Sequence, residues 1–133
     1  MFYFDFCGIF GATSLKAAEQ YTRAIGDFTQ ALEADPSNVA ALTHRGFCWR
    51  KLDDYDRSVQ DYSAAIRLVP DSVRAHNNRA YSLAKMGRFQ EAVQDYSRVI
   101  ALDPTNSHAY HNRGISYDKL GLVDNAIADF KTV

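Results

Sequence analysis

Side chains that could bind a peptide backbone recur at a fixed interval along this chain. Asn78 and Asn112 stand 34 residues apart, and His44 stands 34 residues before Asn78. A carboxamide carries one acceptor and two donors, so it can hold a peptide unit through two hydrogen bonds. Placed in one groove, these residues would hold an extended peptide. The alternative is that they are solvated polar residues on helix surfaces.

Basic side chains repeat at the same interval. Lys51, Lys85 and Lys119 are each 34 residues apart, with Arg50 and Arg74 nearby. Such a row would attract a carboxylate or an acidic segment. A lysine in the last turn of a helix is also favoured by the helix dipole, so a purely structural role stays open.

Two further rows carry opposite charges: Arg45, Arg79 and Arg113, and Asp61, Asp95 and Asp129. An arginine and an aspartate can form two parallel hydrogen bonds, which fixes their relative geometry. We expect these residues to bridge two helices, within one repeat or between neighbours. Because buried arginine is usually paired, a structural role is favoured over contact with a ligand.

Catalysis and metal binding have little support in the sequence. His108 and His111 lie one helical turn apart, but no cysteine or third histidine stands at an obvious ligand spacing. No phosphate-binding loop, nucleophile elbow or paired-carboxylate pattern occurs in a context that would form a pocket. We therefore expect no enzyme, no metal and no cofactor.

The 34-residue interval also organises the elements that must position these side chains. Pro36, Pro70 and Pro104 each stop a helix and are followed by a residue able to cap the next one. A small-residue column, where two helices would cross closely, contains Gly46, Ala80 and Gly114. A period of this length predicts stacked helix-turn-helix units.

These columns resemble those of the tetratricopeptide repeat family. The family pattern is read here as Gly46, Tyr55, Ser58, Tyr62 and Pro70, then Ala80, Phe89, Ala92, Tyr96 and Pro104, then Gly114, Val123, Ala126 and Phe130. The resemblance implies an all-α, right-handed α-solenoid of stacked helix-turn-helix repeats. Its expected parts, all in one repeat domain, are a divergent aromatic segment at 1–21, a partial repeat one at 5–38, repeats two and three at 39–72 and 73–106, and a truncated repeat four at 107–133.

The repeat frame predicts where each helix lies. First helices are expected near 39–52, 73–86 and 107–120, and second helices near 22–34, 56–68, 90–102 and 124–133. Gly87 and Gly121 are expected to end first helices in a left-handed conformation, with Asp53 at the equivalent turn.

The resemblance also implies that first helices line a concave groove that binds a segment of another protein. The expected partner-binding residues are His44, Phe47, Arg74, Asn77, Asn78, Tyr81, Lys85, His108, Asn112 and Lys119. Chaperone-binding family members hold a carboxylate with a clamp of lysine, asparagine and arginine. Here Thr43 and Phe47 replace the first pair, and His108 and Asn112 the last. Binding of heat-shock chaperone tails is therefore not expected.

Composition is consistent with an interaction module. The formal net charge is −1, and no apolar stretch approaches the length of a membrane span. Neither a membrane protein nor a nucleic-acid binder, which would show a basic face, is expected. Two cysteines, Cys7 and Cys48, form no disulfide framework, and Cys48 is expected to be a buried thiol in a reducing compartment such as the cytoplasm.

The two ends depart from the repeat pattern. The first ten residues are rich in aromatics, and a signal peptide is disfavoured because no basic residue precedes Lys16. At the other end, Ala126, Ile127 and Phe130 would normally be covered by a following helix. The chain is expected to be a protein-interaction module. The alternatives are a structural fragment of a longer scaffold, a homo-oligomer formed through the C-terminal helix, and the recruiting array of a larger enzyme.

Overall fold

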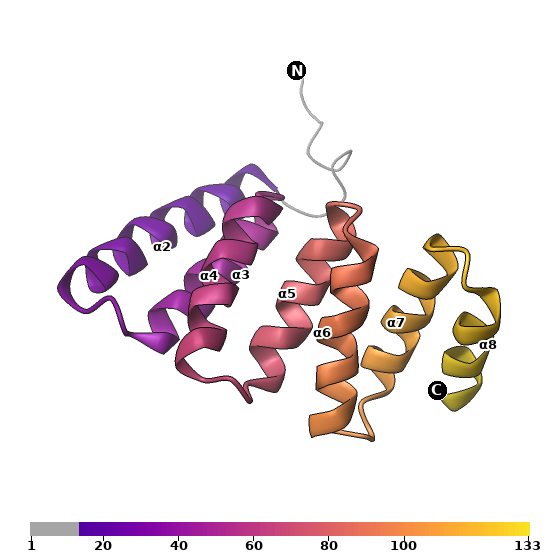
Figure 1. The fold of residues 1–133 in the computed structure, drawn as a ribbon. Coiled ribbons are helices and arrows are strands. Elements are labelled where there is room, and N and C mark those ends of the chain that lie inside the picture. The colour runs from indigo at the N-terminus through magenta and orange to yellow at the C-terminus, as the bar shows by residue number, and fades with distance from the viewer. Residues whose placement is uncertain (1–13) are drawn as a thin grey trace, which may run out of the picture.

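A computed structural model of the chain describes residues 14–133, and in this range it contains seven α-helices and no strand (Figure 1). The helices are α2 (Leu15–Ala34), α3 (Val39–Lys51), α4 (Tyr55–Leu68), α5 (Val73–Lys85), α6 (Phe89–Leu102), α7 (Ser107–Lys119) and α8 (Val123–Thr132). Each helix packs against the next one along the chain. The fold is an all-α solenoid, as the 34-residue period predicts.

The first helices of the repeats form the inner layer of the solenoid. α3 contacts α5, and α5 contacts α7, whereas comparable contacts between α4 and α6 or between α6 and α8 are lacking among the described helices. A layer whose members touch lies on the inside of a curved array, while the other layer spreads apart on the outside. The surface of α3, α5 and α7 that faces away from the second helices is called the inner groove below.

The predicted helix starts are confirmed. Asn38, Ser72 and Asn106 cap α3, α5 and α7, each accepting a hydrogen bond from the backbone N–H three residues on, at 3.0, 3.1 and 3.0 Å. A cap of this kind contributes about 1 kcal/mol to helix stability. Because one cap stands in each repeat, the first helices begin at equivalent positions.

The turns between the two helices of a repeat use left-handed residues, as predicted. Gly87 and Gly121 both have φ of 79°, and Asp53 has φ of 61°. The Asp53 carboxylate accepts a hydrogen bond from the hydroxyl of Tyr55 at 3.0 Å. Aspartate tolerates this conformation better than most residues with a side chain, so the turn is kept without glycine.

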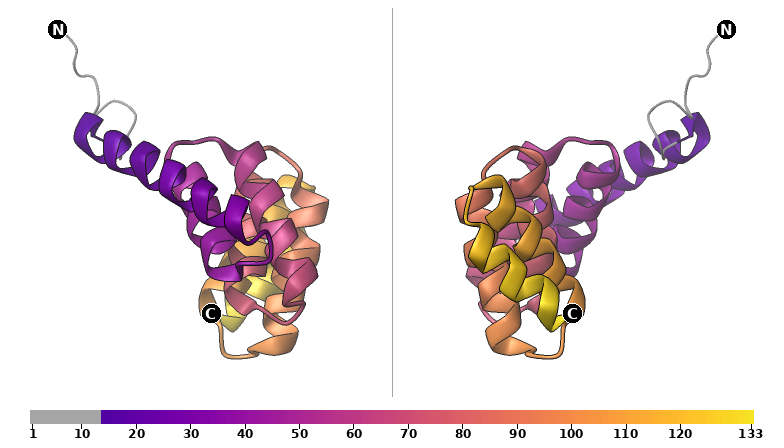
Figure 2. Two further views of the ribbon diagram at one scale, coloured as in Figure 1. Left: turned by 90° about the vertical axis from the view of Figure 1, so that its left-hand side faces the viewer. Right: turned by 90° about the vertical axis from the view of Figure 1, so that its right-hand side faces the viewer.

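The first described helix differs from the prediction. A second helix is expected to begin near residue 22, but α2 is a continuous helix of 20 residues that starts at Leu15, with Ser14 as its N-cap. Glu19 occupies the position of Asp53 and Gly87, and glutamate does not favour a positive φ, so no turn forms there. The first turn of α2 extends beyond the other helices (Figure 2), and Leu15 is 80% exposed. Of the expected segment 1–21, residues 1–13 and with them Cys7 lie outside the described residues.

Small residues let the two helices of each repeat approach closely. A Cβ atom built on Gly46 would lie 3.1 Å from the ring of Tyr62, and one on Gly114 would lie 2.6 Å from the ring of Phe130. Tyr62 and Tyr96 fill the space between repeats and are 0% and 2% exposed. Phe130 holds the equivalent position but is 40% exposed, since among the described helices α8 packs against α7 alone.

Each repeat contains one arginine that connects three helices. The pairs are Arg45 with Asp61, Arg79 with Asp95, and Arg113 with Asp129, all with two hydrogen bonds of 2.7–2.8 Å. In every pair the third nitrogen donates at 3.1 Å to a hydroxyl on the preceding second helix, namely Thr29, Ser63 or Ser97. Hydrogen bonding to the aspartate, the largest cause, raises the pKa of each arginine. These bonds fix both the helix pair and its register on the repeat before it.

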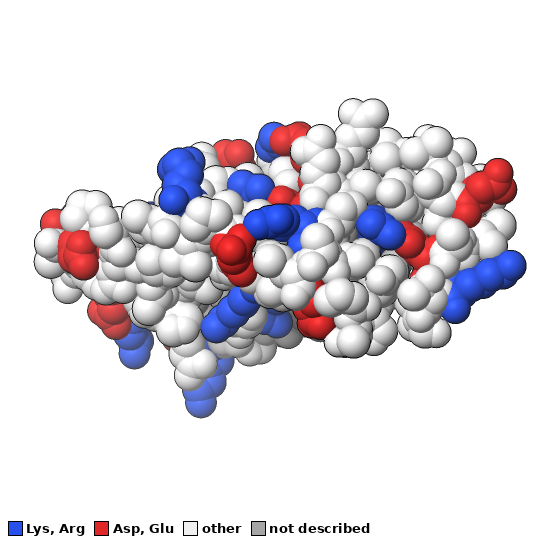
Figure 3. Space-filling view, turned by 60° about the horizontal axis from the view of Figure 1, so that its bottom comes forward, with Lys and Arg blue, Asp and Glu red and all other residues white. Residues whose placement is uncertain are grey.

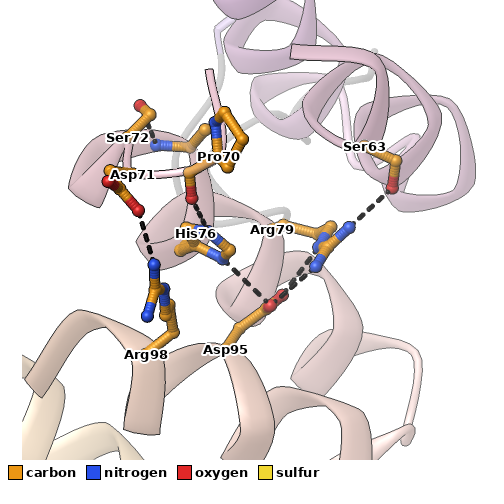
Figure 4. Close-up of polar contacts among 9 residues, drawn as sticks. Ser63, Pro70, Asp71, Ser72, His76, Arg79, Asp95 and Arg98 are labelled. Atoms are coloured by element: carbon orange, nitrogen blue, oxygen red, sulfur yellow. Dashed lines mark hydrogen bonds and ion pairs between the residues drawn. The ribbon is translucent and has the colours of Figure 1, made fainter. Parts of the chain in front are cut away.

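The middle repeat has an additional buried histidine (Figure 4). His76 Nε2 lies 2.8 Å from the carbonyl oxygen of Pro70, and Nδ1 lies 3.3 Å from Oδ1 of Asp95. The same Asp95 carboxylate accepts the two hydrogen bonds from Arg79. His76 therefore connects the turn before α5 to the Arg79–Asp95 ion pair of its own repeat.

Candidate functional site

Aromatic rings and basic side chains alternate on the inner groove where α3 meets α5. The guanidinium carbon of Arg50 lies 4.5 Å from the ring centroid of Tyr81 and 5.2 Å from that of Phe47. The ammonium of Lys51 lies 5.4 Å from the Phe47 ring, and that of Lys85 lies 5.4 Å from the Tyr81 ring. Cations at these distances are attracted to the ring faces. The five residues are called the cation–aromatic row below.

Arg50 differs from the structural arginines in having no acidic partner in the described part of the chain. Its Nε is buried and forms no hydrogen bond there. Burial raises the pKa of the hydroxyls of Tyr55, Tyr62 and Tyr96, and the positive charge of Arg50 opposes this rise. The hydroxyl of Tyr62 is also buried without a hydrogen bond among these residues. Burial raises the pKa of Tyr62 to about 12, an effect that the nearby charges of Arg50 and Arg74 partly oppose.

A pocket continues from the cation–aromatic row into the space between α5 and α7. It has a volume of about 340 Å³. Its lining residues are Tyr81, Ala84, Lys85, Phe89, Tyr96, Asn112, Ile115, Ser116 and Lys119. The rings and Ile115 supply apolar walls, while Lys85 and Lys119 are exposed. A few polar groups on an otherwise apolar concave surface are typical of a binding site.

Four of the ten predicted partner-binding residues meet in this α5–α7 pocket. Tyr81, Lys85, Asn112 and Lys119 all line it. Phe47 joins the same surface because Arg50 lies against both Phe47 and Tyr81. Five of the ten predicted residues therefore belong to the α5–α7 pocket or to the cation–aromatic row, and Tyr81 and Lys85 belong to both.

The row of two asparagines and one histidine is less uniform than its spacing suggests. The side chain of Asn78 donates at 3.0 Å to the carbonyl oxygen of Arg74, one turn earlier in its own helix. The His44 ring packs against Phe28 of α2, with 5.5 Å between centroids. Only Asn112 lies in the α5–α7 pocket. Equal spacing along the chain therefore places these side chains in three different surroundings.

The remaining predicted residues lie in the N-terminal halves of α5 and α7. Arg74 and His108 are exposed, and Asn77 is half-buried. On the same helices the pocket is lined by residues closer to the C-terminal ends, from Tyr81 to Lys85 and from Asn112 to Lys119. His111 packs on Phe130, with 5.7 Å between ring centroids, and within residues 14–133 no group of metal-binding side chains occurs.

Arg50, Phe89 and Tyr96 are site residues that the sequence alone did not single out as partner-binding. The sequence placed Arg50 beside the lysine row that would attract a carboxylate, although its own column contains Ala84 and Asp118. Phe89 and Tyr96 belong to aromatic columns of the repeat pattern. A cation that breaks its column was the available signal for Arg50.

Charged side chains of both signs occur on the surface. On the face drawn in Figure 3, basic and acidic side chains are interspersed within a larger uncharged area. Every helix between residues 14 and 133 is too short or too polar to span a lipid bilayer.

Comparisons with known proteins concern both the sequence and the fold. Family models described as tetratricopeptide repeat match residues 11–73, 73–106 and 96–128. A search of curated proteins gave no match. Together the three models cover the chain from residue 11 to residue 128.

Solved structures of MamA have a similar fold. One, described as the crystal structure of MamA protein, is 23% identical over 89% of this chain and 68% of its own, with a TM-score of 0.81. A second MamA structure is 23% identical over 89% of this chain and 72% of its own, with a TM-score of 0.80. MamA from Desulfovibrio magneticus RS-1, from residue 41 to its end, is 18% identical over 88% and 66%, with a TM-score of 0.81. At these identities the likeness shows the fold alone.

Proposed function

The chain belongs to the tetratricopeptide repeat family, and from this membership we propose that its inner groove binds a segment of a partner protein. Stacked helical repeats of this family form a scaffold for protein–protein interaction. The observation that carries the proposal is the α5–α7 pocket, because it joins a carboxamide, two lysines and apolar walls on the inner side of the array. We propose that the chain acts by binding and has no catalytic activity of its own.

Within this proposal, the residues have different roles. Asn112 holds a peptide unit of the partner at the pocket, and Asn78 and His44 offer further polar contacts along the groove. Asn78 keeps one donor and its acceptor available, because only one N–H of its amide is used by Arg74. Phe47 and Tyr81 provide flat apolar surfaces, and Arg74 and Lys85 provide positive charge near them.

Loss of the two groove asparagines tests the proposal. Partner binding should fall in Asn78→Ala combined with Asn112→Ala, measured by pull-down and by titration of captured peptides, while the far-ultraviolet circular dichroism stays unchanged. A matched control is Gln90→Ala combined with Asn125→Ala, since both residues are exposed carboxamides on second helices. Equal binding by the two double variants would contradict a role for the groove.

A second candidate, self-association through α8, is supported by a different observation. Val123, Ile127 and Phe130 are 52%, 45% and 40% exposed on one helix. The equivalent aromatic residues, Tyr62 and Tyr96, are buried by the first helix of the next repeat. A second copy, or a further repeat of a longer scaffold or enzyme, would cover this surface in the same way.

Localisation remains a proposal that rests on Cys48. This thiol is buried and free, and burial raises its pKa, so it behaves as a packing residue with little thiolate character. We propose a reducing compartment such as the cytoplasm, where a free thiol of this kind is ordinary.

A further inference from the structure

We infer that the groove selects an acidic partner segment, with a carboxylate bound by Arg50 and a neighbouring apolar side chain bound in the α5–α7 pocket. The inference rests on the proposed function and names the class of partner for the same site. It depends on three observations: the clustering of cations on the groove, the fixing of Arg50 between two rings, and the shared position of Tyr81.

Three cations on this part of the groove have no acidic partner within the described residues. Arg50, Lys85 and Lys119 form no ion pair within the described residues, although six other arginines do. Asp118, an exposed acidic residue next to Lys119 on α7, belongs to none of the ion pairs found in the described range. Like charges held close together repel one another, and an anionic ligand removes that repulsion. Charge complementarity therefore favours an acidic occupant over a neutral or basic one.

Arg50 is held in a way that suits a carboxylate. Its guanidinium lies against Phe47 on its own helix and against Tyr81 on the next first helix. The rings restrict the side chain before any ligand arrives, so less conformational entropy is lost on binding. Its Nε is buried, and the other two nitrogens carry the parallel N–H groups that match a carboxylate. Partial burial also strengthens the interaction relative to a fully solvated arginine.

Tyr81 connects the arginine to the α5–α7 pocket. Arg50 stacks on its ring, and the same residue lines the pocket with Phe89 and Ile115. In an extended segment alternate side chains point to one side, about 7 Å apart. A carboxylate and an apolar side chain separated by one residue would therefore reach Arg50 and the pocket together. Asn112 lies in the same pocket, where it can bind the peptide unit between them.

A single-stranded nucleic acid also combines negative charge with groups that stack on aromatic rings. The observations favour a protein segment, because the pocket has aliphatic as well as aromatic walls and basic and acidic residues are interspersed on the face in Figure 3. A nucleic-acid ligand is accordingly one of the outcomes that the experiment separates.

The experiment measures binding of labelled probe peptides to the full chain by fluorescence anisotropy. The test peptide consists of repeated Ser-Asp-Ser-Leu units. Three controls replace aspartate by asparagine, aspartate by lysine, or leucine by alanine, and oligothymidylate serves as the nucleic-acid probe. The protein variants are Arg50→Gln, Arg50→Lys, Ile115→Ser and the Asn78→Ala plus Asn112→Ala double variant. Arg67→Gln is the matched control, since Arg67 is an exposed cation in the last turn of α4.

The acidic leucine peptide should bind most tightly and more weakly at high salt. Arg50→Gln should weaken it about tenfold or more, which is the usual effect of losing a hydrogen bond to a charged group. Arg50→Lys should restore only part of that loss, because lysine lacks the planar fork. Ile115→Ser should reduce the preference for leucine over alanine and leave the preference for aspartate intact. Arg67→Gln should bind like the wild type.

Three results would overturn the inference, and they are distinguishable. Equal or tighter binding of the neutral or basic peptide, still lost in the asparagine double variant, would overturn the acidic preference and leave the proposed function standing. If no peptide binds, or if the groove variants change the binding of none of them, both the inference and the proposed function are overturned. Tighter binding of oligothymidylate, lost in Arg50→Gln, would replace the protein segment by a nucleic acid. Circular dichroism and the urea midpoint of each variant ensure that only folded proteins are compared.

Discussion

Arg79 and Asp95 share two parallel hydrogen bonds of 2.7 Å across the helix pair of the central repeat (Figure 4). The Asp95 carboxylate is buried, and its other close polar neighbour is the ring of His76. Loss of Arg79 would leave this carboxylate without its main partner. Arg79→Ala is therefore expected to destabilise the fold by about 3 kcal/mol, as measured by urea unfolding.

Arg98→Ala provides the control for that substitution. It breaks an ion pair with Asp71 in which both side chains are largely exposed, so the expected loss is below about 1 kcal/mol. Similar losses for the two variants would show that the central pair is no more important than a surface contact.

One substitution should have opposite effects at two glycines. Gly87 has φ of 79°, where alanine is strained, so Gly87→Ala should destabilise the fold by about 1 kcal/mol. Gly26 lies within α2, and a Cβ atom there would meet nothing within 4 Å. Gly26→Ala should therefore stabilise the fold by about 0.5–1 kcal/mol through helix propensity. Thermal unfolding of both variants measures the sign, and a shift in the same direction would contradict the assigned conformations.

Alkaline pH should weaken the fold partly through Tyr62. Burial raises the pKa of this hydroxyl to about 12, whereas an unfolded tyrosine ionises near pH 10. The neutral form is favoured in the folded state, so the stability from this group is fully present below about pH 10 and is lost as the pH rises toward about 12. Tyr62→Phe removes the titrating group, a buried hydroxyl that has no hydrogen bond among the described residues. The free energy of unfolding should then fall less steeply between pH 9 and 11 than in the wild type, and equal slopes would contradict the prediction.

Self-association, if it uses α8, should respond to a charge on its outer side. Ile127 is 45% exposed, and Ile127→Glu would place a carboxylate in any contact formed there. Sedimentation over a range of protein concentrations should show a smaller average mass for this variant than for the wild type. Asn125→Glu, on the same helix at an exposed position, should leave the mass unchanged. A wild-type chain that stays monomeric at all concentrations would exclude the α8 contact.

The repeat spacing alone predicted most of the fold, because local rules repeat with it. Prolines at 36, 70 and 104 and the caps that follow them locate the first helices, and Gly87 and Gly121 locate the turns. The rows of arginine and aspartate are readable in the same way, since a bidentate pair needs only two helices at a constant register. The long α2 could have been recognised from Glu19, which stands where a turn residue is required.

The make-up of the candidate site was decided by tertiary structure, because it depends on contacts between repeats that differ. His44 lies against Phe28 and Asn78 bonds its own helix, although both share a column with Asn112. Arg50 belongs to the site because it packs on Tyr81, a residue 31 positions away in the sequence. Only the stacking of α3 on α5 brings the guanidinium carbon within 4.5 Å of the Tyr81 ring centroid. Periodicity reports what the repeats have in common and therefore predicts the scaffold. A binding surface arises from what each repeat does differently, and the packing of neighbouring helices determines which of those differences meet.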